Sequence, residues 1–120
     1  MQELDWSLDL GMMILFYASA GLAHFLMPKF FLKIIPPYIP MPNLVNGLVG
    51  LVEMTLALGL AFSTTRTAAA IGVVCLLLAV FPANVYHLTS GGAGMNIPKW
   101  LLWIRLPLQG LLIFWAWQYV

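Results

Sequence analysis

The chain has 120 residues, of which 62% are hydrophobic and only 8% are charged, and its mean hydropathy is +0.96. A soluble domain carries about 25% charged residues, and a soluble core of this length could not bury so much apolar surface. The excess apolar surface is therefore expected to face lipid. Five basic and four acidic residues give a net charge of +1, which excludes the basic surface that nucleic-acid binding requires. A single cysteine, Cys75, excludes an internal disulfide and a dithiol redox pair.

Four apolar runs are long enough to cross a bilayer, at roughly residues 8–28, 44–63, 67–88 and 99–119. We therefore predict an all-α fold, in which residues 1–120 form one integral membrane four-helix bundle in contact with the lipid bilayer. The first run follows acidic residues instead of the basic residues of a signal peptide, so we expect the first helix to be retained. Asp5 or Ser7 is placed to cap its first turn.

The connections between the runs differ in character. Residues 29–43, KFFLKIIPPYIPMPN, combine lysines with aromatic and proline residues, which predicts a short interfacial helix followed by a stiff return. This segment forms either a structural lid over the end of the bundle or a gate for a substrate or partner. Residues 63–66 are predicted to form a short turn that makes the second and third runs antiparallel neighbours. The glycines of residues 89–98 indicate a flexible loop.

An even number of spans places both chain ends on the same side of the membrane. The basic residues that border the two faces are Lys29, Lys33 and Lys99 on one side and Arg66 on the other. The positive-inside rule therefore places the first and third loops in the cytoplasm. Aromatic residues gather at the two expected interfaces, with Trp6, Trp115, Trp117 and Tyr119 at one and Tyr38, Tyr86 and Trp100 at the other. Small residues at helical spacing indicate close helix packing and are compatible with a homodimer.

Six polar side chains within the runs are candidates for ligand binding: His24, Glu53, Asn84, His87, Arg105 and Gln109. A charged side chain at the middle of a span costs about 2.5–3.5 kcal/mol. The helical rise places Glu53 roughly 13 Å and Arg105 roughly 9 Å from the same membrane face. We therefore predict a Glu53–Arg105 ion pair, which either only fixes the helix register or belongs to a functional pocket. His24 reaches the same region and either pairs with Glu53 or contacts a ligand.

Two prolines, Pro82 and Pro107, lie beside this polar set. Proline has no backbone donor, so the carbonyls four residues earlier, at Leu78 and Trp103, become available acceptors. The resulting kinks would aim the polar side chains at one region, with or without a ligand there. The histidines and the glutamate lack the spacing of a metal site, and a nearby arginine repels cations, so no metal is predicted. No catalytic motif is recognisable, and whether the chain is an enzyme stays open.

Five motifs follow one another between Ala20 and Trp117: AGLAHFLMPKFF, IIPPYIPMP, VFPANVYH, RLPLQ and WAW. A glycine-rich run that contains Glu53 separates the second motif from the third. In this order and spacing the motifs make the chain resemble the DoxX-like small membrane proteins. The resemblance implies a four-helix integral membrane protein, usually of the bacterial cytoplasmic membrane.

The resemblance implies two different functions. DoxD-type relatives are subunits of a thiosulfate:quinone oxidoreductase, which implies an accessory redox role with a bound quinone. The residues implied to bond the quinone head group are Arg105, Glu53, Asn84, His24 and Gln109, with Trp103 and Phe81 as ring contacts. NACHO, an animal assembly chaperone for nicotinic receptors, is also similar to this family and implies recognition of transmembrane helices in a membrane protein partner.

A third interpretation is a structural subunit whose charged residues only organise the bundle. Of the three, we favour an intramembrane polar pocket that binds a small lipophilic ligand such as a quinone. The chain would then be an accessory subunit of an oxidoreductase.

Overall fold

The computed structural model describes residues 6–92 and 97–120. Within these ranges the chain forms five helices: α1 (Leu8–Leu26), α2 (Pro28–Ile34), α3 (Pro42–Ala61), α4 (Ser63–Thr89) and α5 (Lys99–Trp117). Helices α1, α3, α4 and α5 are long and apolar enough to cross a membrane. The predicted all-α architecture, with four spans and a short helix after the first, is confirmed, and the protein is a membrane protein.

Local side-chain chemistry defines both ends of α1. The Ser7 hydroxyl accepts a hydrogen bond from the Leu10 amide at 3.4 Å, and Asp9 lies near the positive end of the helix dipole. Ser7 is therefore the cap, and the alternative cap, Asp5, lies outside the described residues. Helix α1 ends before the predicted position because Pro28 opens α2 instead of extending the first span.

The turn between α3 and α4 is shorter than predicted. Only Phe62 separates the two helices, and residues 63–66 form the first turn of α4. Thr65 Oγ1 donates to the Gly59 carbonyl at 2.6 Å, and Arg66 Nε donates to the Leu60 carbonyl at 2.9 Å. The polar residues that suggested a loop therefore satisfy the last carbonyls of α3 from within α4. The predicted pairing of these two spans as neighbours is confirmed.

The connection between α4 and α5 is described in part. Gly91 and Gly92 have φ of 70° and 100°, the left-handed region that glycine adopts without strain. Their amides donate to the carbonyls of Leu88 and His87 at 3.1 and 2.9 Å, which closes α4 with a glycine cap. Residues 93–96 of the predicted flexible loop lie outside the described residues.

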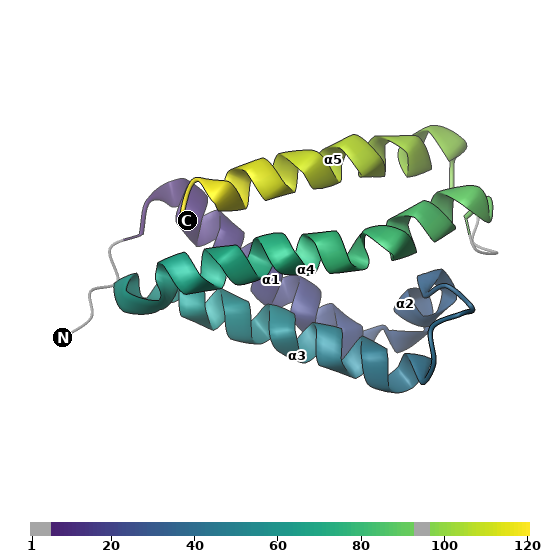
Figure 1. The fold of residues 1–120 in the computed structure, drawn as a ribbon, viewed down its shortest axis with the longest axis horizontal. Coiled ribbons are helices and arrows are strands. Elements are labelled where there is room, and N and C mark those ends of the chain that lie inside the picture. The colour runs from purple at the N-terminus through teal and green to yellow at the C-terminus, as the bar shows by residue number, and fades with distance from the viewer. Residues whose placement is uncertain (1–5, 93–96) are drawn as a thin grey trace.

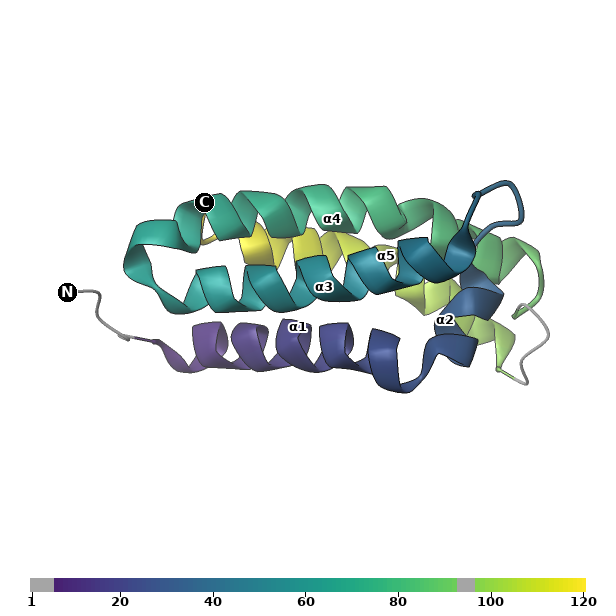
Figure 2. The same cartoon turned by 90° about the horizontal axis from the view of Figure 1, so that it is seen from below.

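The spanning helices follow one another in space as α1, α3, α4 and α5 (Figure 1). The start of α1, the end of α5 and the α3–α4 turn lie together at what we call the terminal end. Helix α2, residues 35–41 and the start of α5 lie at the opposite end, which we call the lid end (Figure 2). The start of the first span and the end of the last span were predicted to lie on the same side of the membrane, and they lie at the same end of the bundle.

Helices α1 and α5 meet at the terminal end through their side chains. Asp9 accepts a hydrogen bond from the Tyr119 hydroxyl and another, at 3.4 Å, from Trp115 Nε1. We call these three residues the Asp9 clasp. Trp6 Nε1 donates to the Ala61 carbonyl at 2.7 Å at the same end. The backbones of α1 and α5, both described in full, make no close contact along their length, so the clasp is the main polar link between them.

The apolar core fills the terminal half of the bundle. Its buried residues come from the early turns of α1 and α4 and the late turns of α3 and α5: Leu10, Met13, Tyr17, Ala57, Leu60, Ala69, Ala70, Val73, Leu77 and Ala116. Several of them are alanines, which let the helices approach closely. This core holds the four spans together at the terminal end. The polar residues of the spans lie mainly toward the lid end.

Candidate ligand-binding cavity

A partly open cavity of about 440 Å³ lies in the lid half of the bundle, with walls from all four spanning helices. Its lining is mainly apolar and includes seven residues with polar side chains: Tyr17, His24, Tyr38, Asn46, Glu53, Asn84 and Arg105. Small-molecule sites typically have volumes of about 300–1,000 Å³ and combine apolar walls with a few polar groups. Four of the predicted ligand-binding residues therefore lie on a cavity of suitable size and character.

Helix α2 and residues 35–39 line the lid end of this cavity. The Phe31 ring stacks on the His24 ring with a centroid separation of 3.8 Å. The lining continues through the apolar residues Ile34, Ile35, Pro36 and Ile39 and through Tyr38. The segment therefore lies over the end of the bundle as expected, and its action as a gate stays a prediction.

Two glycines set the distance between α1 and α3. A Cβ on Gly50 would lie 2.7 Å from the His24 Cβ and 2.9 Å from the Gly21 carbonyl oxygen. A Cβ on Gly21 would lie 2.7 Å from the Gly50 carbonyl oxygen. Only glycine allows the two backbones to come this close. The contact holds His24 against the face of α3 that carries Asn46 and Glu53.

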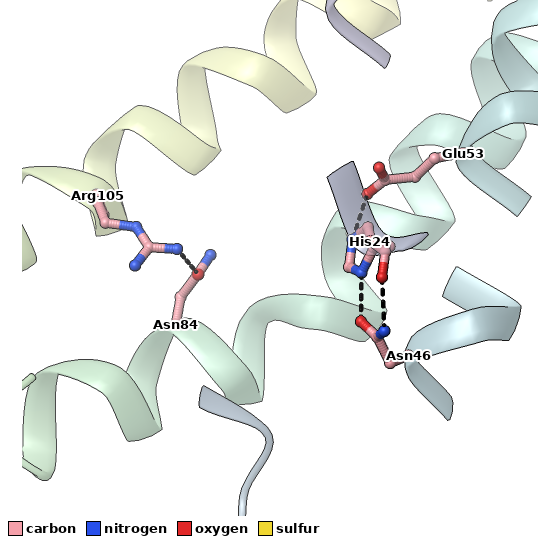
Figure 3. A network of polar contacts seen from close by, with 5 residues as sticks. All are labelled: His24, Asn46, Glu53, Asn84 and Arg105. Atoms are coloured by element: carbon pink, nitrogen blue, oxygen red, sulfur yellow. Dashed lines mark hydrogen bonds and ion pairs between the residues drawn. The ribbon is translucent and has the colours of Figure 1, made fainter. Parts of the chain in front are cut away.

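Asn46 fixes the hydrogen positions of the His24 ring. The Asn46 amide nitrogen donates to the His24 carbonyl at 2.9 Å, so Asn46 Oδ1 faces ring Nδ1 at 2.7 Å and Nδ1 carries a hydrogen. The other ring nitrogen, Nε2, lies 3.7 Å from Glu53 Oε1. This contact is attractive when the pair holds one proton, on Nε2 or on Oε1. We call His24, Asn46 and Glu53 the glutamate wall (Figure 3).

Two polar atoms on this side of the cavity lack a partner. The Tyr17 hydroxyl and Glu53 Oε2 are buried, and neither has a hydrogen-bond partner within the described part of the chain. A buried polar group left without a partner costs about 1–3 kcal/mol. Because both residues line the cavity, a ligand that hydrogen-bonds to them would remove this cost.

A second polar cluster, here called the arginine wall, joins α4 and α5. Arg105 Nη2 donates to Asn84 Oδ1 at 2.8 Å, and its Nη1 donates to Nδ1 of His87. Asn84 Nδ2 donates to Gln109 Oε1, and Gln109 Nε2 donates to the Leu77 carbonyl. The bonds form one chain from the guanidinium to the backbone of α4, so the polar faces of the two helices meet.

Two members of the arginine wall lie behind the surface of the large cavity. Gln109 is buried and lines a smaller adjoining cavity of about 200 Å³, whereas His87 is buried and lines neither cavity. Since arginine stays protonated, His87 Nδ1 accepts its bond and the ring hydrogen is on Nε2, which is buried without a described partner. His87 and Gln109 therefore position Arg105 and Asn84 and do not themselves reach the large cavity.

The predicted Glu53–Arg105 ion pair is wrong. The two side chains line the same cavity from different walls (Figure 3), and among the described residues no carboxylate lies within ion-pair distance of Arg105. The reason is the order of the helices, because α4 lies between α3 and α5. The prediction used only the depth of each residue in the membrane, because the order of the helices is not evident from the sequence. The positively charged guanidinium of Arg105 therefore bonds to two neutral side chains, Asn84 and His87, among the described residues.

One smaller expectation is corrected, that of the ring contacts, and one is left untested. Near Pro82, the Leu77 carbonyl accepts the side-chain bond from Gln109, and the availability of the Leu78 and Trp103 carbonyls stays a prediction. Leu77 is buried toward α5, whereas Leu78 is 60% exposed on the outer face. Trp103 and Phe81, the expected ring contacts, are exposed on the outer helix faces and do not line the cavity.

Tyr17, Asn46 and Phe31 are cavity residues that were not among the six candidates named from the sequence. Tyr17 and Asn46 each lie two helical turns from a predicted site residue, His24 and Glu53 respectively, on the same helix face. That spacing is the signal that could have found them. Phe31 has no comparable signal, because its place over His24 depends on how α2 folds back.

A comparison with protein families matches residues 13–120 to a domain of unknown function, DUF8561. No curated protein and no solved structure matches the chain. The resemblance to DoxX-like proteins stays a prediction.

Proposed function

Since this chain belongs to the DUF8561 family, a domain of unknown function, we propose its function from the cavity: it binds an amphipathic, lipid-soluble ligand, with a quinone as the candidate. The proposal rests on two polar walls that face one otherwise apolar cavity within the bundle. An apolar lining suits a hydrocarbon-rich molecule, and a few fixed polar groups orient its head.

The hydrogen-bonding groups of the cavity suit a quinone head group. A quinone is a flat ring with carbonyl oxygens on opposite sides. A guanidinium has five N–H donors, of which the described bonds of Arg105 use two. One quinone oxygen can accept from Arg105, and the other can accept from the unpartnered Tyr17 hydroxyl. The ring then lies between the two walls.

We place this function in the bacterial cytoplasmic membrane, in an accessory role to a membrane oxidoreductase. The DoxX-like resemblance supports this setting. In that role the chain holds the quinone, and the partner carries out the electron transfer. The lipid-facing surfaces of the spans are available to such a partner or to a second copy of this chain.

The test is a binding titration of the purified protein, followed by native mass spectrometry, with a quinone that carries a ten-carbon tail. We expect one quinone per chain. Arg105→Met should lower the affinity about tenfold or more, because a hydrogen bond to a charged group contributes about 1.5–3 kcal/mol. Leu111→Met is the matched control, because Leu111 is on the same helix and faces outward with 64% exposure.

Equal affinity in Arg105→Met and Leu111→Met would remove Arg105 from the site. If no quinone binds and the protein instead co-purifies with a membrane protein in fixed proportion, the quinone proposal fails. The assembly-chaperone or structural-subunit interpretation then takes its place.

A further inference from the structure

The unpartnered oxygen of Glu53 is a hydrogen-bond acceptor in both protonation states of its pair with His24. If the shared proton is on His24 Nε2, Glu53 is a carboxylate and both its oxygens accept. If the proton is on Glu53 Oε1, the remaining oxygen, Oε2, still accepts. Glu53 lines the cavity, and its Oε2 is buried with no described partner, so the glutamate wall has an acceptor without a donor beside the cavity.

The arginine wall presents the opposite character. Arg105 has no acceptor atom and does not lose its proton, so it can only donate to a ligand. Figure 3 shows that Arg105 and Glu53 extend from separate helices, with no bond between the two walls. The cavity therefore offers a donor at one wall and an acceptor at the other.

Tyr17 adds a group of mixed character beside the glutamate wall. Its hydroxyl can donate one bond and accept others, and it is buried without a described partner. A ligand hydroxyl at this wall can donate to Glu53 Oε2 and accept from the Tyr17 hydroxyl. Both of these unpartnered atoms then gain a hydrogen-bond partner. A ligand carbonyl there accepts from Tyr17 but leaves Glu53 Oε2 facing another acceptor.

Building on the proposed function, we infer that the cavity selects a head group with a hydroxyl donor at Glu53 and an oxygen acceptor at Arg105. Within a quinone couple, this description fits the reduced hydroquinone, which has hydroxyl groups on both sides of the ring. The fully oxidised quinone has no donor. The protein therefore binds the hydroquinone more tightly than the quinone.

The test compares three ligands with the same ten-carbon tail: a hydroquinone kept reduced with ascorbate, its quinone, and its dimethyl ether, which cannot donate. We expect the hydroquinone to bind about tenfold or more tightly than either other ligand, because sites built around a hydroxyl discriminate strongly against analogues that lack it. A tenfold preference also raises the midpoint potential of the bound two-electron couple by about 30 mV.

Two variants assign the preference to Glu53. Glu53→Met removes the acceptor and should reduce the preference to less than about threefold. Glu53→Gln should keep it, because the amide nitrogen can donate to His24 Nε2 while the amide oxygen accepts from the ligand. Folding of each variant is checked by its circular dichroism spectrum.

The outcomes separate this inference from the proposed function. If the wild-type protein binds hydroquinone and quinone equally, the inference is overturned and quinone binding stands. Equal binding of the dimethyl ether, or a preference that persists in folded Glu53→Met, also overturns it. If none of the three ligands binds, the proposed function itself fails.

Discussion

The terminal half and the lid half of this bundle use the same four helices in opposite ways. In the terminal half, side chains such as Met13 and Leu60 have no exposed surface and fill the space between the helices. In the lid half, the same helices surround a cavity of about 440 Å³ and leave buried polar atoms of Tyr17 and Glu53 without described partners. One half is filled by apolar side chains, whereas the other surrounds a mainly apolar cavity that has a few polar groups on its walls.

This difference separates stability from binding. Lipid is as apolar as a leucine side chain, so close packing, and not removal from water, holds membrane helices together. The terminal core provides that packing. The lid half can then keep charged and unpartnered groups, which are costly within a membrane and mark functional sites. Tyr17 lies at the boundary, because it belongs to the terminal core and also lines the cavity.

The largest effect is expected where packing and the polar site coincide, at Gly50. A Cβ in Gly50→Ala would lie 2.7 Å from the His24 Cβ and 2.9 Å from the Gly21 carbonyl oxygen, so α1 and α3 must separate. We expect the free energy of unfolding to fall by about 3 kcal/mol, which is the upper end of the usual destabilisation by overpacking. Ligand binding should be lost as well. Reversible unfolding in mixed micelles measures the first effect and the quinone titration the second.

Gly47→Ala is the matched control, because a Cβ on Gly47 meets nothing within 4 Å on the same helix. Its unfolding free energy should stay the same or rise by up to about 1 kcal/mol, since alanine favours a helix more than glycine does. Equal destabilisation by the two substitutions would contradict the close contact at Gly50.

A smaller effect, limited to stability, is expected at Leu60 in the terminal core. Leu60→Ala should lower the unfolding free energy by about 2 kcal/mol, mainly through the cavity that it leaves. The ligand affinity should change less than about threefold, because Leu60 does not line the cavity. Leu58→Ala, at a position that is 63% exposed, should change neither quantity. A large loss of binding in Leu60→Ala would show that the two halves are coupled.

The fold could be predicted because its signals are local. Four runs of apolar residues specify the spans, and Pro28 with the lysines after it specifies the short helix α2. The exception is the α3–α4 turn. Thr65 and Arg66 suggested a loop, but they bond to carbonyls of α3 from within a helix, and a polar residue in the sequence does not reveal which carbonyl it will satisfy.

The site could be predicted only in part, because it depends on the order of the helices. The polar side chains beside Pro82 and Pro107 were expected to gather in one region, where Asn84 bonds to Gln109 and Arg105 bonds to His87. Matching depths could not show that α4 separates α3 from α5, so the expected pairing of Glu53 with Arg105 was wrong. Two ionisable residues at similar depth in a membrane therefore either pair or face each other across a cavity, and only the helix order distinguishes the two.

The smallest effect is expected at the Asp9 clasp. Tyr119→Phe removes the hydroxyl that bonds to Asp9 and should lower the unfolding free energy by about 0.5–1 kcal/mol, the usual contribution of one hydrogen bond. Partial burial raises the pKa of the Tyr119 phenol, and its bond to Asp9 raises it further. The contact is therefore complete at neutral pH and is lost as the pH rises through that raised pKa.

Trp117→Phe, at an exposed position outside the clasp, is the control. Because the clasp is at the terminal end, quinone affinity should be the same in both variants, and a change confined to Tyr119→Phe would mean that the clasp also sets the width of the cavity.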